Sequence, residues 1–132
     1  MIVLDTHILV WLISTPEKLS LKAQRTINNE IKRGKQLLVS SMSVWEICLL
    51  VKKGKLKLHG DLDAWFDKLE QFAFLQFIPV DNKIAAKSVN LPGKFHDDPA
   101  YRIIIATACE YGVKLATADK RILKYRHVQS VW

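Results

Sequence analysis

Met1-Ile-Val-Leu-Asp-Thr-His7 opens the chain, and the interpretation of every later segment depends on it. Residues 1–4 form a short apolar run, which is typical of a strand buried on both faces in a parallel sheet. The next apolar stretch, Ile8 to Ile13, predicts a helix that packs back on this strand. Asp5 would then stand at the carboxyl end of a central strand, where open α/β sheets bind ligands. The alternative is a structural Asp5 that only caps the helix, because Asp is a preferred N-cap residue.

Length and composition narrow the class of protein. A chain of 132 residues with 49% hydrophobic and 25% charged residues has the values of a soluble, single-domain protein. It contains neither a signal-like segment nor an apolar run approaching the roughly 20 residues that cross a membrane, so we expect a cytoplasmic protein without a membrane partner. The net charge of +7 is spread over both halves and favours a polyanionic partner only weakly.

Strand-like and helix-like segments alternate along the whole chain. Short buried strands are predicted at residues 1–4, 36–40, 74–80, 114–117 and 127–131. Helices are predicted at residues 8–13, 21–32, 43–51, 61–72, 81–89, 99–110 and 120–124. This alternation predicts an α/β fold, with a five-stranded parallel sheet flanked by helices, in one domain that spans residues 1–132.

Acidic residues recur where strands end or where the following helices begin. Asp5, Glu46 and Asp119 hold such positions, and Asp98 begins another helix. Because the carboxyl ends of parallel strands meet at one edge, we expect these four side chains around one cleft. Neighbouring carboxylates repel, so such a cluster favours a hard cation such as Mg²⁺ or Mn²⁺, which suits phosphodiester hydrolysis. Zinc is not expected, because the histidines are scattered and form no cluster with cysteine.

Three features have structural alternatives that the sequence leaves open. Ser43 and Glu46 have the spacing of a capping box, in which Glu46 would only close the start of its helix. The basic turn at residues 52–57 is either a solvated loop or a patch that steers phosphate. An apolar stripe in the predicted helix at 61–72 indicates a core or an interface. Its members are Leu62, Trp65, Phe66 and Leu69.

Four segments together resemble the PIN-domain ribonucleases, and above all the toxins of bacterial VapBC toxin–antitoxin pairs. They are Leu4–His7, Ser43–Ile47, Asp98–Ala108 and Leu115–Asp119. The resemblance covers the whole chain and implies a three-layer sandwich with Mg²⁺- or Mn²⁺-dependent endoribonuclease activity on RNA. It also implies a cognate antitoxin and frequent homodimerisation. For these partners we expect exposed apolar surface on the helix at 61–72 and around Trp11.

The resemblance also assigns roles to individual residues. It implies catalytic roles for Asp5, Glu46 and Asp119, and metal contacts from Asp5, Asp98 and Asp119. Small polar residues beside the metal and a neighbouring arginine would support this site. They are Thr6, Thr117 and Arg102.

One position departs from the family pattern. The family usually reads Asp-Pro-x-Asp-Arg, and Tyr101 stands where the second Asp is a metal-site carboxylate. A phenol, with a reference pKa near ~10, brings no charge at neutral pH. Either Asp97 or Asp98 partly substitutes in a working enzyme, or the site is crippled, naturally or by an introduced mutation. If the site is crippled, the chain is an inactive PIN domain that binds RNA or an antitoxin. A receiver-like signalling domain fits less well, because Asp5 has no acidic neighbour.

Overall fold

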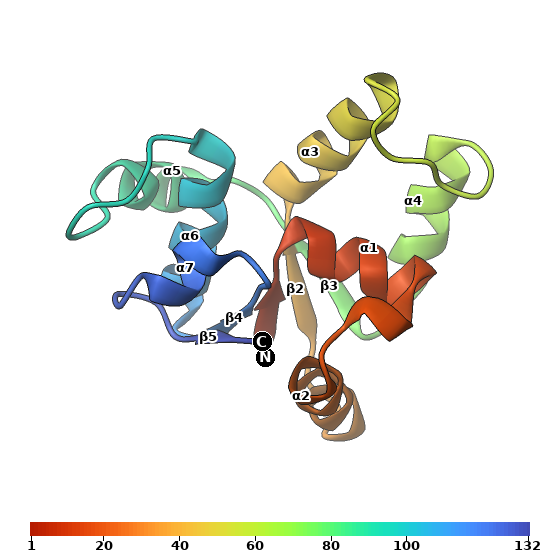
Figure 1. Cartoon of the computed structure of the whole chain (residues 1–132), viewed down its shortest axis with the longest axis horizontal. Coiled ribbons are helices and arrows are strands. Elements are labelled where there is room, and N and C mark those ends of the chain that lie inside the picture. The colour runs from red at the N-terminus through yellow and green to blue at the C-terminus, as the bar shows by residue number, and fades with distance from the viewer.

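The strands form one parallel sheet, as the sequence predicts. The computed structural model describes residues 1–132 and contains β1 (Ile2–Leu4), β2 (Leu37–Ser40), β3 (Leu75–Ile78), β4 (Lys114–Ala116) and β5 (Ser130–Val131). Their order is β3-β2-β1-β4-β5, and all neighbouring strands are parallel. The expected five-stranded parallel sheet is therefore confirmed, with β1 at its centre (Figure 1).

Helices connect the strands, and local sequence determines where most of them start. The helices are α1 (Thr6–Ser14), the 3-10 helix η1 (Pro16–Lys18), α2 (Leu21–Lys32), α3 (Ser41–Lys52), α4 (Leu62–Glu70), α5 (Asn82–Val89), α6 (Pro99–Tyr111) and α7 (Lys120–Lys124). Side-chain oxygens of Ser20, Asp61 and Asp81 each accept a hydrogen bond from the first turn of the helix that follows. None of the helices has the length and apolar character needed to cross a membrane.

The sheet is buried between two layers of helices (Figure 1). Successive side chains of a strand point to opposite faces. Ile2 and Leu4 accordingly pack in a core with α1, α2, α3 and α4, whereas Val3 packs in a second core with α5, α6 and α7. In β2, Leu37 and Leu38 divide between the two cores in the same way. The three-layer sandwich expected from the sequence is confirmed.

Two element boundaries differ from the prediction. α3 begins at Ser41 rather than at Ser43, because Ser40 is its N-cap and accepts a hydrogen bond from the Met42 amide at 3.1 Å. The fifth strand is shorter than the predicted residues 127–131. Only Ser130–Val131 pairs, with Leu115 and Ala116 of β4.

The aromatic stripe of α4 is mostly internal. Trp65 is 6% exposed and belongs to the core, while Phe66 and Trp11 are half-buried and pack against that core. The prediction that this helix and the surroundings of Trp11 supply exposed apolar surface is therefore wrong, and the core interpretation of the stripe holds. Large apolar side chains are exposed elsewhere, and the most exposed are Trp45, Leu21 and Val89.

Candidate active site

Asp5 is a buried carboxylate at the carboxyl end of the central strand. The residue is 3% exposed. Its Oδ1 accepts a hydrogen bond from the Thr6 amide at 2.8 Å, and its Oδ2 accepts one from the Thr117 hydroxyl at 2.7 Å. Burial raises the pKa of Asp5 above its ordinary value, although both hydrogen bonds act in the opposite direction. Asp5 therefore caps α1 and also lines a pocket, so its structural and functional interpretations are compatible.

Glu46 contacts Thr6 instead of the start of its own helix. The Thr6 hydroxyl donates to Glu46 Oε1 at 2.6 Å and lies 2.9 Å from the Ser43 hydroxyl. Ser43 is buried inside α3, so the capping-box interpretation is wrong. Burial raises the pKa of Glu46, the Thr6 hydrogen bond opposes this, and the negative charges of Asp5 and Asp98 add to it. The acidic residues from β1, α3 and α6 are thus near enough to influence one another.

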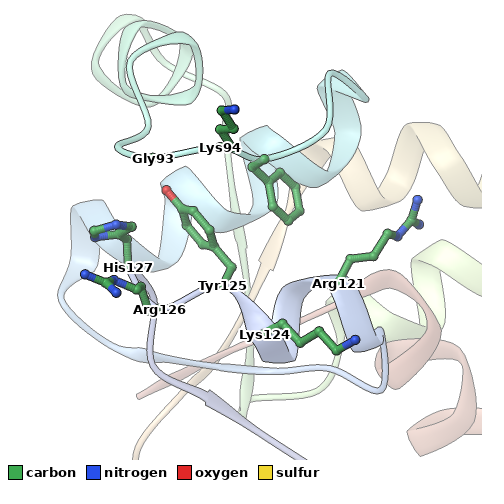
Figure 2. Close-up of a pocket in the computed structure, with 8 residues that line it drawn as sticks. Gly93, Lys94, Arg121, Lys124, Tyr125, Arg126 and His127 are labelled. Carbon is green, nitrogen blue, oxygen red and sulfur yellow. The ribbon is translucent and has the colours of Figure 1, made fainter.

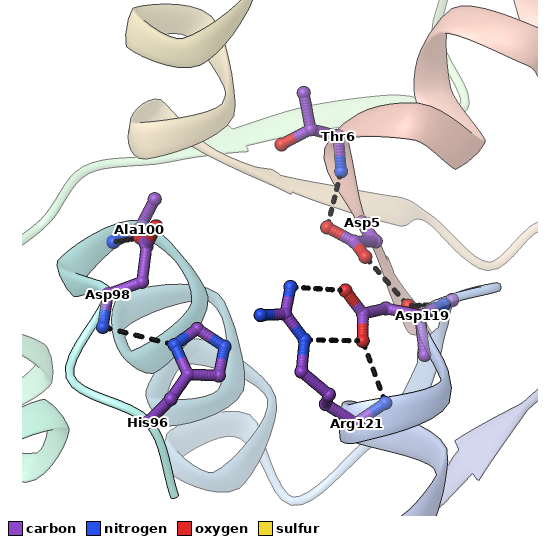
Figure 3. A network of polar contacts seen from close by, with 8 residues as sticks. Asp5, Thr6, His96, Asp98, Ala100, Asp119 and Arg121 are labelled. Atoms are coloured by element: carbon purple, nitrogen blue, oxygen red, sulfur yellow. Dashed lines mark hydrogen bonds and ion pairs between the residues drawn. The ribbon is translucent and has the colours of Figure 1, made fainter.

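Asp119 is paired with a cation of the same chain. Its Oδ1 accepts a hydrogen bond from the Arg121 amide at 2.8 Å and caps α7. The Arg121 guanidinium also donates a hydrogen bond to each carboxylate oxygen, from Nη2 to Oδ2 at 3.1 Å and from Nε to Oδ1 at 3.3 Å (Figure 3). Desolvation opposes ionisation of Asp119, but the hydrogen bonds and charge of Arg121 outweigh it and hold the pKa below its ordinary value. Asp119 is therefore an ionised and neutralised carboxylate.

Tyr101 contacts the same guanidinium. The guanidinium carbon of Arg121 lies 4.8 Å from the centroid of the Tyr101 ring, within the range of a cation–π contact. The ring also packs edge-on against His96, with centroids 4.9 Å apart. Burial, followed by the negative charge of Asp119, raises the pKa of Tyr101 to about 12. The phenol stays neutral, so this position supplies an aromatic face where the family pattern has a carboxylate.

The acidic residues divide between two pockets. Asp5 and Asp119 line a pocket of about 260 Å³. Glu46 and Asp98 line another of about 470 Å³, which also includes the exposed Trp45. No group of three or more His, Cys, Asp or Glu side chains is placed to hold a metal ion. The expectation of four carboxylates around one cleft is therefore wrong, and Asp98, whose Oδ1 caps α6, does not complete a set with Asp5 and Asp119.

The predicted supporting residues differ in what they contact. The Thr117 hydroxyl donates to Asp5 and accepts a hydrogen bond from the Asp119 amide at 3.0 Å, so it links the two carboxylate-bearing segments. Arg102 instead fastens the segment between α5 and α6 through backbone carbonyls. It donates to Ser88, Val89 and Phe95 at 2.8, 3.1 and 3.2 Å. Arg102 thus acts on the chain that leads to Asp98, not on the pocket of Asp5.

Family comparison identifies the fold and the class of relatives. The sequence pattern of the PIN domain matches residues 2–128. The chain belongs to the PIN-domain family. This PIN domain is 31% identical over 130 residues to Ribonuclease VapC22 of Mycobacterium tuberculosis, and the match covers 98% of this chain and 95% of that protein.

Two solved structures share this PIN-domain fold over nearly the whole chain. VapBC2 from Rickettsia felis, bound to a DNA fragment from its promoter, has a TM-score of 0.70 and 17% identity, covering 99% of this chain and 98% of that one. A toxin–antitoxin complex from Klebsiella pneumoniae has a TM-score of 0.64 and 20% identity, covering 100% and 97%. At these identities the likeness establishes the fold.

The pocket of Asp5 and Asp119 suits one hard cation held by few protein ligands. Mg²⁺ takes oxygen ligands and is commonly bound by one or two carboxylates, completed by water and substrate phosphate. Two carboxylates in one pocket meet that requirement. The neutral phenol of Tyr101 adds no charge beside this pocket, and Asp119 is already paired with Arg121. The donor set therefore fits a loosely held cation that competes with Arg121.

Sequence reasoning missed three residues of this PIN-domain site. His7 and Trp11 line the pocket of Asp5, with ring centroids 6.0 Å apart, and Arg121 pairs with Asp119. A signal for Arg121 existed, because it lies two residues after an N-cap carboxylate, within the first turn of α7. No local pattern could have indicated that Tyr101 of α6 packs on the same guanidinium.

Proposed function

We propose that this chain is the endoribonuclease toxin of a type II toxin–antitoxin pair, which hydrolyses RNA phosphodiester bonds with Mg²⁺ or Mn²⁺ and is attenuated by Tyr101. The identity of 31% to a ribonuclease over nearly the whole chain supports the nuclease class. The observation that carries the proposal is the pair of carboxylates, Asp5 and Asp119, joined through the Thr117 hydroxyl in one pocket at the carboxyl edge of the sheet.

The residues of the chain would bind, orient and accept a proton. Asp5 and Asp119 would hold the cation, which when bound polarises a phosphoryl group and makes a bound water more acidic. Thr117 fixes the orientation of Asp5 through a 2.7 Å hydrogen bond. Glu46 is the candidate general base, because burial raises its pKa above the ordinary value and the Thr6 hydroxyl holds its Oε1 at 2.6 Å. Asp98 is left as a peripheral charge beside Glu46.

Partners of this toxin would include an antitoxin and a second copy of the chain. The structural relative from Klebsiella pneumoniae is a toxin–antitoxin complex, which supports an antitoxin partner. The apolar pocket lined by Trp45, Leu49 and Leu50 is the surface we assign to it, since Trp45 is 58% exposed. The homodimer is implied by the family resemblance, and sedimentation velocity tests it. The cytoplasmic location expected from the sequence is consistent with a bacterial toxin–antitoxin pair.

A growth assay tests the proposed activity and its attenuation. Expression of the chain in a bacterial host should slow growth weakly, and Tyr101→Asp should strengthen the arrest by restoring the carboxylate. Tyr111→Asp, which makes the same exchange at an exposed position of α6, is the matched control and should leave the weak effect unchanged. Identical growth of all three strains and the empty vector would overturn the proposal.

The pairing of Asp119 with Arg121 beside Tyr101 favours a second candidate function. In that case the guanidinium replaces the metal ion, and the chain is an inactive PIN domain that binds RNA or an antitoxin. The two candidates differ in one result. An inactive module binds RNA but cleaves none with Mn²⁺, whereas an attenuated enzyme cleaves slowly.

A further inference from the structure

A basic and aromatic pocket lies between the loop before α6 and the segment from α7 to β5 (Figure 2). Its volume is about 400 Å³, which is within the range of pockets that bind small molecules. The residues that line it include no Asp or Glu. They are Gly93, Lys94, Phe95, Arg121, Lys124, Tyr125, Arg126 and His127. We call this site the basic pocket.

The cations of the basic pocket are almost all without an anionic partner. The molecule has three ion pairs, which are Met1–Glu30, Lys87–Glu110 and Arg121–Asp119. Lys94, Lys124 and Arg126 take part in none of them, and all three side chains are exposed. A concave surface with several uncompensated positive charges concentrates anions, polyanions above all.

Aromatic rings form the wall between these cations. The Tyr125 ring lies 5.1 Å from the Phe95 ring and 5.3 Å from the His127 ring, measured between centroids. The Tyr125 hydroxyl donates to the Pro92 carbonyl at 2.6 Å, which holds the loop in place. Gly93 has a φ of +70°, and a Cβ there would lie 3.3 Å from His127 Nε2, so glycine lets the loop approach the ring. Rings interleaved with cations are typical of sites that stack single-stranded bases and track their phosphates.

Arg121 lines the basic pocket and is paired with Asp119, which lines the pocket of Asp5. Its guanidinium neutralises the Asp119 carboxylate, so the residue connects the two pockets. The Arg121 side chain is 57% exposed, so water screens its ion pair with Asp119. A phosphate offers a guanidinium an equivalent bidentate partner. A phosphate in the basic pocket can therefore take Arg121 from Asp119 and leave that carboxylate free.

We propose that the basic pocket is a subsite for one phosphate and its adjoining base of single-stranded RNA, next to the pocket of Asp5 and Asp119, and that Arg121 moves from Asp119 to this phosphate when RNA binds. The proposal rests on the RNA-directed function given above and adds the place where the strand is held. RNA fits better than an acidic peptide, because the exposed ring of His127 suits stacking on a base, whereas a carboxylate gains nothing from a ring face.

Binding without cleavage tests the subsite. Fluorescence anisotropy with a labelled, fully 2′-O-methylated ten-nucleotide RNA in EDTA gives Kd and its salt dependence. Lys124→Ala/Arg126→Ala should raise Kd roughly ten-fold and lower the logarithmic salt slope by about 0.7, since the subsite holds one phosphate and each lost single-strand phosphate contact removes about 0.7. The matched control, Lys22→Ala/Arg25→Ala, removes the same charge from the exposed face of α2 and should change Kd less than about two-fold.

Three results would overturn the subsite. Equal weakening by both double variants would mean that RNA follows net charge alone. Tighter binding of a polyglutamate peptide than of RNA, lost in Lys124→Ala/Arg126→Ala, would assign the pocket to a protein partner instead. If the unmodified chain cleaves RNA but Lys124→Ala/Arg126→Ala binds RNA as tightly as the unmodified chain, the subsite is refuted and the nuclease function is supported. If binding depends on the basic pocket but no RNA is cleaved, the subsite is supported and the nuclease function is refuted.

Titration of Mn²⁺ by calorimetry tests the movement of Arg121. The methylated RNA should tighten Mn²⁺ binding to the unmodified chain several-fold, because it removes the guanidinium from Asp119. In Arg121→Ala, Mn²⁺ should bind more tightly from the outset, and RNA should add little. Equal Mn²⁺ affinity with and without RNA in the unmodified chain would contradict the movement.

Discussion

Replacement of Tyr101 by Asp should lower the stability of the metal-free protein and raise the stability of the metal-bound protein. The new carboxylate would lie near Asp5 and Asp119, whose charges already act on Tyr101. Loss of the aromatic pair with His96, 4.9 Å between centroids, costs about 0.5–1.5 kcal/mol. With like-charge repulsion added, we expect a loss of about 1–3 kcal/mol, or a fall in Tm of roughly 4–12 °C at about 4 °C per kcal/mol.

With enough Mn²⁺, Tyr101→Asp should become more stable than the unmodified chain. Binding stabilises the folded state by RT ln(1 + [L]/Kd), which gives about 2.7 kcal/mol at a free metal concentration of ~100 times Kd. Tyr101→Asp should reach that gain at a lower Mn²⁺ concentration than the unmodified chain, because it has one more oxygen ligand. Thermal denaturation over a Mn²⁺ series measures both effects.

The same series on Tyr111→Asp controls for a new charge on α6 away from the pocket, since Tyr111 is 41% exposed near the end of that helix. Its Mn²⁺ response should match that of the unmodified chain. If Tyr101→Asp also matches it, position 101 does not face a metal site, and the reasoning that assigns the attenuation to Tyr101 is refuted.

Three further outcomes follow from the hydrogen bonds and charges of the site. Thr117→Val should lower the free energy of unfolding by about 1–3 kcal/mol, because a buried oxygen of Asp5 loses its hydrogen-bond donor. Thr26→Val removes an exposed hydroxyl and should cost far less, so equal losses in urea titrations would contradict this. Because the pKa of Asp5 is raised, the folded state binds this proton more tightly than the unfolded state. The contribution of Asp5 to stability therefore falls as pH rises from 3.8, the ordinary pKa of Asp, through the pKa in the folded state. Asp5→Asn should flatten that part of the stability–pH curve. Arg102→Met should speed amide hydrogen exchange at residues 90–97, and unchanged exchange rates there would show that the carbonyl contacts of Arg102 do not hold the segment.

The fold was predictable because each strand is a short apolar run bounded by polar residues. Such runs, separated by helical patterns, leave few arrangements other than a parallel sheet covered on both faces. Caps were predictable for the same local reason, and the side chains of Asp5 and Asp98 cap the helices that follow them, as expected. The position of β1 at the centre explains why Asp5, which follows it, is buried within the carboxyl edge.

The errors arose where tertiary contacts compete with local ones. Ser43 and Glu46 have the spacing of a capping box, but the N-cap of α3 is Ser40, three residues earlier. The Glu46 carboxylate instead accepts a hydrogen bond from the Thr6 hydroxyl at the start of α1. Four strand-end acids suggested one cluster, but Arg121 neutralises Asp119 and the remaining acids face two pockets. These outcomes depend on distances between elements that spacing along a chain does not encode.

Cleavage of RNA by the purified chain tests the central claim most directly. A labelled single-stranded RNA is incubated with excess unmodified protein, and with Asp5→Asn, in Mn²⁺ and in EDTA. We predict slow cleavage by the unmodified chain in Mn²⁺, and none in EDTA or with Asp5→Asn, because Asp5 is the buried carboxylate on which the cation site depends. Cleavage that persists in Asp5→Asn, or the absence of cleavage by the unmodified chain in Mn²⁺, would contradict the account.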